Sequence, residues 1–419
     1  MARNIQRRDV LKGAGLAGIA GLAGCVGGLG GGGGGSREIK YGVLMPVTGD
    51  LSSVGQPIRD GATLPGKQLN NNDDFGTTID FQVEDTATSP QTGINAANTL
   101  VNAGYPGVCG PASSGVNIQV SNQVFIPNEV VGCSPSSTSP SVTTLEDDGY
   151  IFRTAPSDAL QGQVMAQVGT SSIGASSAAT LYVNNDYGQL LSQSFADAFK
   201  NEGGSVQKQV AFEKEQSSYS SKLRQALTDG PDLLVVIGYP ASGVQLFKDY
   251  YADFAGDGSE EQILVTDGLQ DPAMQEKIGN PMENVTGTAP QPSGPAADAF
   301  ANLYEEEYGR APGIFNAHAY DASATLILAN AAGGENSGSV VRDNMQAVAN
   351  PGGMEVTASN LAEGVQAAMD GDDVQYAGAS SAVDYDDNGD MKAVTYSVWK
   401  FAPDSDSGIE VTDTINFSA

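Results

Sequence analysis

Residues 233–253 read LLVVIGYPASGVQLFKDYYAD, and this stretch decides the fold class of the chain. Its first five residues, 233–237, are apolar without interruption, as expected of a strand that is covered on both faces of a parallel sheet. Residues 241–253 then read as a helix. A buried strand followed directly by a helix predicts one unit of a βαβ series.

The same unit recurs along the chain in two groups, one before residue 155 and one after residue 178. The predicted strands are 39–45, 79–84, 107–109, 130–133, 179–183, 205–211, 233–237 and 262–266. The helices between them are predicted at 57–70, 90–103, from 114, 188–201, 218–228 and 241–253. A series interrupted once predicts an α/β protein with two parallel-sheet lobes. After residue 290 we expect helices through about residue 369, then a hairpin-like end with its turn at 386–389 and a final strand at 393–401.

The first 24 residues have the order of an export signal. The pair Arg7-Arg8 precedes a short apolar run rich in Gly, Ala and Leu, and small residues come just before Cys25. The stretch resembles a twin-arginine signal joined to a lipoprotein box, in which Cys25 becomes the lipidated first residue. Residues 25–37, the lipidated Cys and a glycine-rich linker, are predicted to form a flexible tether. We therefore expect an extracytoplasmic protein held at the outer face of the cell membrane by a lipid anchor.

The chain is strongly acidic, with a formal net charge of −30. Residues 1–24 hold four positive charges and one negative charge, a net +3, so the remaining chain is near −33. Nucleic acid and anionic lipid surfaces are therefore expected to be poor partners, because phosphate binding needs a basic footprint. Adaptation to high salt, typical of a halophilic archaeal protein, is the favoured explanation, because salt screens the repulsion. An acidity that serves cation binding is the alternative.

Two cysteines remain if Cys25 is lipidated. Cys109 and Cys133 both fall at the ends of predicted strands. Neighbouring strands lie ~4.8 Å apart, which is within disulfide range. A disulfide and two small buried thiols are both consistent with this pattern.

Residues for catalysis, metal binding or cofactor binding do not assemble into a motif. The chain has one histidine, His318, in a predicted helix without a partnering nucleophile. Residues 384–389 match the first half of a calcium loop, but its twelfth position is Thr395 rather than Glu, so a β-turn is favoured. We expect no enzyme activity, no cofactor and no metal site.

Hydroxyl residues follow two strands of the first predicted lobe. Ser113 and Ser114 open a helix just after one strand, and Ser136, Ser137 and Thr138 repeat this arrangement after the next. Hydroxyls and free N–H groups at the carboxyl edge of an open α/β sheet predict an anion site, such as one for a carboxylate. Two ordinary capped helices are the alternative interpretation.

The second predicted lobe contributes aromatic residues and one carboxylate at its strand ends. These are Tyr187, Tyr239 and Asp267. A buried carboxylate needs a cationic partner, so a zwitterion is predicted, with its carboxylate on the first lobe and its ammonium on Asp267. A helix N-cap is the alternative role for Asp267.

Six motifs in the chain resemble, in their order, those of solute-binding proteins of branched-chain amino acid ABC transporters, the leucine/isoleucine/valine-binding family. They are YGVLMPVTGD at 41–50, GQPIRDGA at 55–62, FRTAPSD at 152–158, NDYG at 185–188, AYDA at 319–322 and DDNGD at 386–390. The resemblance covers residues 39–401. It implies the type I periplasmic-binding-protein fold, which has two Rossmann-like lobes joined by a three-crossover hinge with the ligand closed between them.

The resemblance also implies boundaries and roles. Crossovers near Ala155-Pro156, Ala289-Pro290 and residue 390 would give a first lobe of 38–155 plus 290–390 and a second of 156–289 plus 391–419. By the resemblance, Ser114, Ser136 and Thr138 would hold the ligand's carboxylate and amino groups from the first lobe, and Tyr187, Tyr239 and Asp267 would close on the ligand from the second.

The favoured function is therefore a monomeric solute-binding component of an ABC importer. It would capture a small amino acid, with a branched-chain one favoured, and deliver it to ABC permease subunits in the membrane. A sensor component on the same fold, or a binder of urea, short amides or aromatic acids, is the alternative.

Overall fold

The computed structural model describes residues 37–256, 261–402, 405 and 407–418. Residues 37–419 form one compact unit. The predicted signal, the predicted lipidation site Cys25 and all of the linker except Arg37 lie outside the described residues. In the described part, every helix is too short or too polar to cross a membrane.

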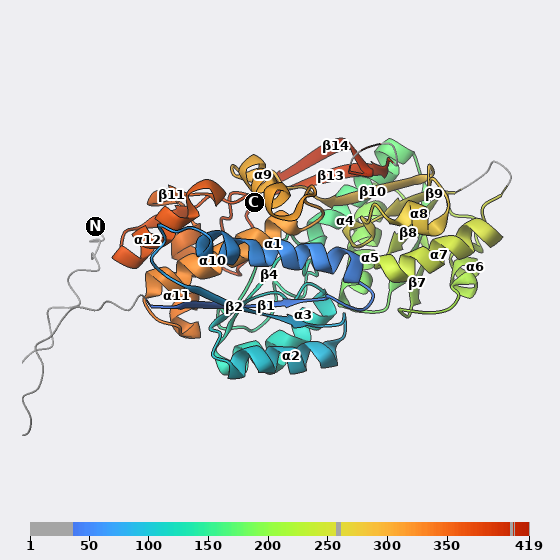
Figure 1. Ribbon diagram of the computed structural model, residues 1–419. Helices are drawn as coiled ribbons and strands as arrows, with labels where there is room; N and C mark the ends of the chain where they lie inside the picture. The colour runs from blue at the N-terminus through green and yellow to red at the C-terminus, as the bar shows by residue number, and fades with distance from the viewer. Residues whose placement is uncertain (1–36, 257–260, 403–404, 406, 419) are drawn as a thin grey trace, which may run out of the picture. The chain divides into compact units, whose positions relative to one another are not determined.

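The first sheet has five parallel strands in the order β2-β1-β3-β4-β5. The strands are β1 (Ile39–Met45), β2 (Ile79–Asp85), β3 (Gly107–Cys109), β4 (Val131–Ser134) and β5 (Ile151–Arg153). Helices α2 (Pro90–Asn102) and α3 (Ser114–Val120) cover one face, and α1 (Ser52–Asn70) and α10 (Asn316–Gly333) cover the other (Figure 1). Helices on both faces explain why the inner strands β1, β3 and β4 are almost completely buried, whereas the edge strand β2 is mostly half-buried.

The second sheet has seven strands in the order β14-β13-β10-β9-β8-β6-β7. Its parallel strands are β6 (Ser177–Val183), β7 (Ser205–Phe212), β8 (Leu233–Ile237), β9 (Gln262–Val265) and β10 (Val285–Pro290). Strands β13 (Ala393–Phe401) and β14 (Ile409–Ser418) add to β10 as an antiparallel hairpin. The accompanying helices are α4 (Asp158–Gln167), α5 (Asp186–Asn201), α6 (Ser220–Leu227), α7 (Pro240–Asp253) and α8 (Met274–Ile278). The predicted two-lobe α/β fold is confirmed.

The region after residue 290 is helical, as predicted, with one addition. It contains α9 (Ala297–Tyr308), α10, α11 (Gly338–Ala349) and α12 (Leu361–Asp370). The addition is a two-stranded parallel sheet of β11 (Met354–Val356) and β12 (Val374–Tyr376). The prediction that 393–401 is the final strand is wrong, because β14 pairs with it along its whole length.

Helices α1 and α10 approach each other closely at Gly61. A Cβ atom at this position would lie 2.4 Å from the backbone oxygen of Asn316, at the start of α10. Real Cβ atoms do not come this near to backbone, so glycine permits the contact. The contact brings the beginning of α10 against α1, and this placement shapes the site described below.

The connection near residue 390 is tied to the first sheet by a buried ion pair. The guanidinium of Arg153, at the end of β5, donates through Nε and Nη2 to the carboxylate of Asp390, at 2.6 and 2.7 Å. The predicted turn at 386–389 is confirmed, since the Asp386 carboxylate accepts the backbone N–H groups of Asn388 and Asp390. The lobe boundaries and the three crossovers stay predictions.

The cysteines of β3 and β4 are register partners, as expected, but both are free thiols. The Sγ atom of Cys109 lies 3.6 Å from the carbonyl oxygen of Ala319, and that of Cys133 lies 3.5 Å from the hydroxyl of Tyr385. Each sulfur thus faces its own partner on the face of the sheet that α1 and α10 cover. The structure thus has two buried thiols here, the second of the two alternatives. Burial raises the pKa of Cys133 to about 12.

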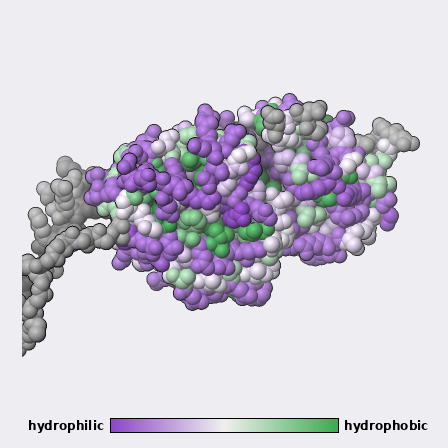
Figure 2. Space-filling model, viewed as in Figure 1, coloured by the Kyte–Doolittle hydropathy of each residue, from purple (hydrophilic) through white to green (hydrophobic). Residues whose placement is uncertain are grey.

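The described surface is polar, in agreement with the acidic composition. Among the described large hydrophobic residues, only Met354 and Val411 are exposed, with 41% and 46% of their surface accessible. The face of the molecule in Figure 2 is mostly hydrophilic, with smaller apolar areas between the polar ones.

Candidate functional site

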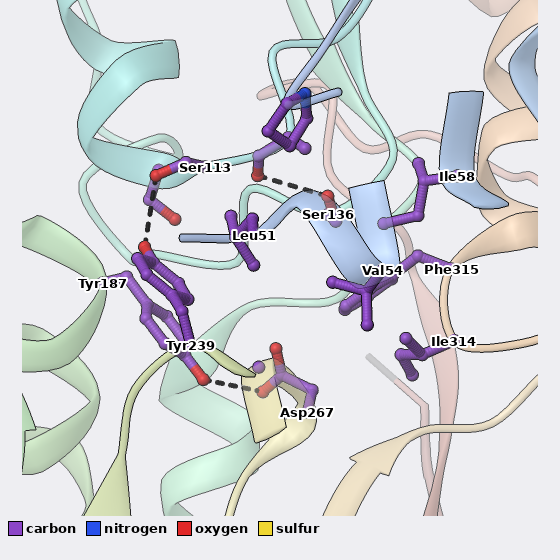
Figure 3. Close-up of a pocket in the computed structure, with 14 residues that line it drawn as sticks. Leu51, Val54, Ile58, Ser113, Ser136, Tyr187, Tyr239, Asp267, Ile314 and Phe315 are labelled. Carbon is purple, nitrogen blue, oxygen red and sulfur yellow. Dashed lines mark hydrogen bonds between the residues drawn. The ribbon is translucent and has the colours of Figure 1, made fainter. Parts of the chain in front are cut away.

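A cavity lies among loops at the carboxyl ends of strands from both sheets. It encloses about 400 Å³ of empty space, including its opening to solvent. Its polar side is formed by Ser113, Ser114, Ser136, Tyr187, Tyr239 and Asp267, and its apolar side by Leu51, Val54, Ile58, Ile314 and Phe315 (Figure 3). The structure therefore brings together six of the eight predicted ligand residues. Ser137 and Thr138 do not line the cavity.

The serines after β3 are placed by the start of α3. Ser113 occupies the N-cap position, but its side chain makes no capping hydrogen bond. Its hydroxyl instead lies 3.2 Å from the hydroxyl of Tyr239. The Ser114 hydroxyl accepts the backbone N–H of Ser139 at 3.3 Å. The capped-helix interpretation thus fails for Ser113, whose hydroxyl instead connects the loop after β3 of the first sheet with the loop after β8 of the second.

The hydroxyl residues after β4 do not open a helix, so this part of the prediction is wrong. Residues 134–139 form a loop that is held by the Ser134 hydroxyl, which accepts the N–H groups of Ser136 and Ser137. Ser136 donates its hydroxyl to the carbonyl oxygen of Ala112 at 3.2 Å. The side chains of Ser137 and Thr138 turn into the interior.

Two tyrosines stack beside the carboxylate. The rings of Tyr187, on α5, and Tyr239, just before α7, are 5.6 Å apart and nearly parallel. The Tyr187 hydroxyl lies 2.7 Å from the Thr266 hydroxyl and donates to Asp267 at 3.2 Å. The Nδ2 atom of Asn185 donates to the Tyr239 hydroxyl at 2.9 Å. Each phenol is thereby fixed in orientation.

Asp267 lies at the start of the short helix η5 (Asp267–Leu269), directly after β9. Thr266, not Asp267, occupies the N-cap position, so the alternative role for Asp267 is not observed. Only 4% of Asp267 is exposed, and burial raises the pKa of its carboxyl to about 6. Of the described residues, none that lines the cavity is Lys or Arg, so a charged Asp267 faces no basic side chain there.

Sequence reasoning missed the apolar side of the cavity. Leu51, Val54 and Ile58 lie at and after the start of α1, with the spacing of one helical face. Ile314 and Phe315 precede α10 and reach the same side through the close contact of the two helices. The helical spacing in α1 was a readable signal, but the pairing of α1 with residue 315 is a tertiary feature.

Sequence reasoning also missed Asp158 and Gln161 of α4, both completely buried. Burial, and then the negative charge of Asp267, raise the pKa of Asp158. Among the described residues, no group of three or more His, Cys, Asp or Glu side chains is arranged to hold a metal ion. His318 lies in α10, as predicted, and is buried there.

The sequence matches the family model described as periplasmic binding protein over residues 38–371. A relative, the Leu/Ile/Val-binding protein homolog 3 of Brucella melitensis, is 29% identical over 242 residues, or 55% of this chain and 62% of the relative. This match thus spans less than two thirds of that relative. The leucine-, isoleucine-, valine-, threonine- and alanine-binding protein of Pseudomonas aeruginosa is 23% identical over 88% of this chain and 91% of its own.

Solved structures share the fold. The leucine-binding protein LivK from Thermotoga maritima has a TM-score of 0.73 and 23% identity, over 90% of this chain and 98% of its own. A solute-binding protein from R. palustris in complex with benzoate has a TM-score of 0.70 and 16% identity, over 91% of this chain and 96% of its own. The two structures have different named ligands, so the fold alone does not identify the ligand of this chain.

Proposed function

Since this chain belongs to the periplasmic binding protein family, we propose that it binds a small α-amino acid in the cavity and serves as the solute-binding component of an ABC importer. One observation carries the choice of ligand. Asp267 is a buried carboxylate on a cavity whose other described polar groups are neutral. A ligand that fills this space has to bring a positive charge to Asp267.

The remaining polar groups suit the carboxylate of a zwitterion. The hydroxyls of Ser113, Ser114 and Ser136 lie on the first-sheet side of the cavity. Neutral donors hold a carboxylate through hydrogen bonds without cancelling its charge. An amino acid would keep the total charge of ligand and Asp267 at one negative unit, whereas an aromatic acid without an amine would place two like charges together. This difference favours an amino acid over benzoate-like ligands.

The apolar side suits an aliphatic side chain. Val54, Ile58 and Phe315 present only hydrocarbon to the cavity. Burying apolar ligand surface against them contributes ~25 cal/mol for each Å². The names of the relatives from Brucella and Pseudomonas support the same ligand class. A branched-chain amino acid is therefore the proposed ligand.

The cellular setting is proposed on the predicted N-terminal segment. Residues 1–24 would be an export signal, Cys25 the lipidated residue, and the folded part a monomer that delivers its ligand to permease subunits in the membrane. The lobes would be 38–155 plus 290–390 and 156–289 plus 391–419, closing around the ligand. A sensor component would use the same cavity. Uptake of leucine by membranes that carry the cognate permease, dependent on this protein, would support the transport role over the sensor role.

Calorimetric titration of the protein in high salt tests the proposal. We expect one-to-one binding of L-leucine and L-valine, and no binding of benzoate or urea. Asp267→Asn should weaken leucine binding ~10²- to 10³-fold, because it removes the counter-charge of a desolvated ammonium. The matched control is Asp271→Asn, which changes a buried carboxylate of the same segment that does not line the cavity. Binding of benzoate or urea in place of amino acids would overturn the ligand assignment.

A further inference from the structure

The turn that leads into α10 holds a bulky residue in a left-handed backbone conformation. The backbone N–H of Asn316 donates to the carbonyl oxygen of Gly313 at 3.4 Å, so Ile314 and Phe315 occupy the two central positions of a β-turn. Phe315 has φ 60° and ψ 3°, a combination that glycine adopts readily and an aromatic residue rarely. Residues in such conformations are concentrated at ligand sites. Here two successive side chains, those of Ile314 and Phe315, both reach the cavity.

Hydrogen bonds of the Asn316 side chain keep the turn in this shape. When its amide is oriented with the oxygen toward donors, Asn316 accepts hydrogen bonds from the hydroxyl of Tyr304 at 2.8 Å and from the N–H of Gly313 at 3.2 Å. Its amide nitrogen then donates to the carbonyl oxygen of Ile314 at 2.9 Å. Asn316 is completely buried. The position of Ile314 is therefore fixed by the protein itself.

Ile314 also borders a second hollow, the outer groove. This groove encloses about 1130 Å³ of empty space, including its opening to solvent. Its apolar lining includes Pro272, Pro290, Pro292, Phe300 and Val411. Among the described residues that line it, only Asp298 is charged. Of all the described residues that line either space, Ile314 alone lines both the cavity and the outer groove.

Ile314 has the burial expected of a partition between these two spaces. Only 8% of its surface is accessible, although it borders two hollows. Val54 and Ile58 of α1 line the cavity but not the outer groove. Shortening Val54 would therefore enlarge the cavity by a closed recess, whereas shortening Ile314 would remove the side chain that stands between the cavity and the groove.

We propose that Ile314 limits the length of the ligand's side chain, because it closes the cavity where the cavity would otherwise continue into the outer groove. This inference rests on the proposed function, since it needs an α-amino acid in the cavity. With the ammonium at Asp267 and the carboxylate near the serines, the side chain of the ligand points to the apolar side, where Ile314 lies (Figure 3). The groove suits the end of an uncharged hydrocarbon chain, and Asp298 disfavours an acidic one.

The consequence is a cut-off in side-chain length. Each further CH₂ group that is buried should tighten binding about fourfold. In the wild type, affinity should rise along a series of unbranched L-α-amino acids and then fall once the chain meets Ile314, because overpacking is costly. In Ile314→Ala the rise should continue, so the Kd for 2-aminooctanoate relative to that for leucine should fall about tenfold or more.

Titration calorimetry of the full-length protein in high salt measures the cut-off. The ligands are L-norvaline, L-norleucine, L-2-aminoheptanoate and L-2-aminooctanoate, with L-leucine as the reference. The matched control is Val54→Ala, which should weaken leucine binding without giving 2-aminooctanoate the gain seen in Ile314→Ala. If Ile314→Ala does not fold, Ile314→Val removes a single CH₂ unit and should move the cut-off in the same direction by a smaller amount.

A second substitution tests whether the longer chain enters the outer groove. Ala301 of α9 lines the groove, is half-buried and does not line the cavity. Ala301→Trp would fill part of the groove. Combined with Ile314→Ala, it should cancel the gain for 2-aminooctanoate and leave leucine binding as it is in Ile314→Ala alone. A gain that survives Ala301→Trp would overturn the role of the groove.

Two results would overturn the role of Ile314 itself. One is the same length profile in the wild type and in Ile314→Ala, and the other is wild-type binding of 2-aminooctanoate as tight as that of norleucine. In either case, leucine binding that depends on Asp267 would still support the proposed function. A folded wild-type protein that binds no amino acid would overturn both proposals.

Discussion

Removing the carboxylate of Asp50 should weaken ligand binding even though Asp50 does not line the cavity. Asp50 follows β1 of the first sheet, and it contacts the start of α7, which belongs to the second sheet. The backbone N–H of Ser242 donates to Oδ1 of Asp50 at 2.8 Å, and the Ser242 hydroxyl lies 2.9 Å from both carboxylate oxygens. Both residues are almost completely buried. These hydrogen bonds therefore connect the two sides between which we propose the ligand is held.

The size of the effect follows from the groups left behind. In Asp50→Ala, the backbone N–H and the hydroxyl hydrogen of Ser242 would lose their acceptor in the closed form, whereas water could accept from both in an open form. The Ser242 hydroxyl oxygen would still accept the N–H of Glu215. An unpaired buried group costs about 1–3 kcal/mol. Two such groups, with partial relaxation, would shift the open–closed balance by about 2–4 kcal/mol. At 1.4 kcal/mol for each factor of ten, the Kd for leucine should rise about 30- to 700-fold.

Titration calorimetry gives the Kd, and stopped-flow displacement of bound leucine gives the dissociation rate, where most of the change is expected. The matched control is Asp232→Ala. Asp232 accepts three hydrogen bonds from Ser176 and Ser177, and all three residues lie in or beside β6 and β8 of the second sheet. The control should keep the wild-type Kd. Wild-type affinity in Asp50→Ala would refute the idea that this contact stabilises the closed form.

Two further predictions concern stability and reactivity. Burial lowers the pKa of His318 from 6.5 to about 3, so the unfolded chain binds the proton first, and stability present above pH 6.5 is lost as the pH falls. Relative to His318→Gln, the wild type should lose about 3 kcal/mol of unfolding free energy between pH 7 and pH 4, measured in denaturant titrations; parallel curves for the two proteins would contradict this. The thiols of Cys109 and Cys133 are completely buried, and their pKa values are raised by burial. Peptide mapping after treatment with a thiol reagent should find both cysteines labelled only in unfolded protein, and labelling under native conditions would show that β3 and β4 open.

The central parallel strands could be predicted closely because their burial leaves a signal in each strand alone. The prediction for β8, Leu233–Ile237, is correct at both ends, since five apolar residues stand between polar or glycine neighbours. β11 and β12 have only three residues each, too few to show a period of two. β14 was missed for a different reason. Its apolar residues alternate with polar ones on an exposed edge, and its place is set by pairing with β13.

The polar side of the cavity was more predictable than its apolar side. Parallel strands end at a common edge, so hydroxyls after β3 and a carboxylate after β9 could be placed at strand ends from sequence order. No equivalent rule links Val54 in α1 with Phe315 before α10. Their meeting depends on the packing of two helices that are distant in sequence, at a point where Gly61 allows close approach. Ser137 also follows a strand end, but the loop after β4 does not open a helix, and the Ser137 side chain is buried away from the cavity. Position after a strand therefore does not by itself predict that a residue lines the site.

Asp158 shows why a completely buried carboxyl group is difficult to recognise from the sequence. It follows Ser157, whose hydroxyl caps α4 by accepting the N–H of Ala159, and an acidic residue in the first turn of a helix ordinarily interacts with the helix dipole at the surface. The local pattern is therefore complete without any functional role. In the structure the carboxyl group is completely buried, and the loss of its hydration raises its pKa. The charge of Asp267 raises the pKa of Asp158 further, so a residue that reads as an ordinary first-turn acid in the sequence has an extraordinary environment in the fold.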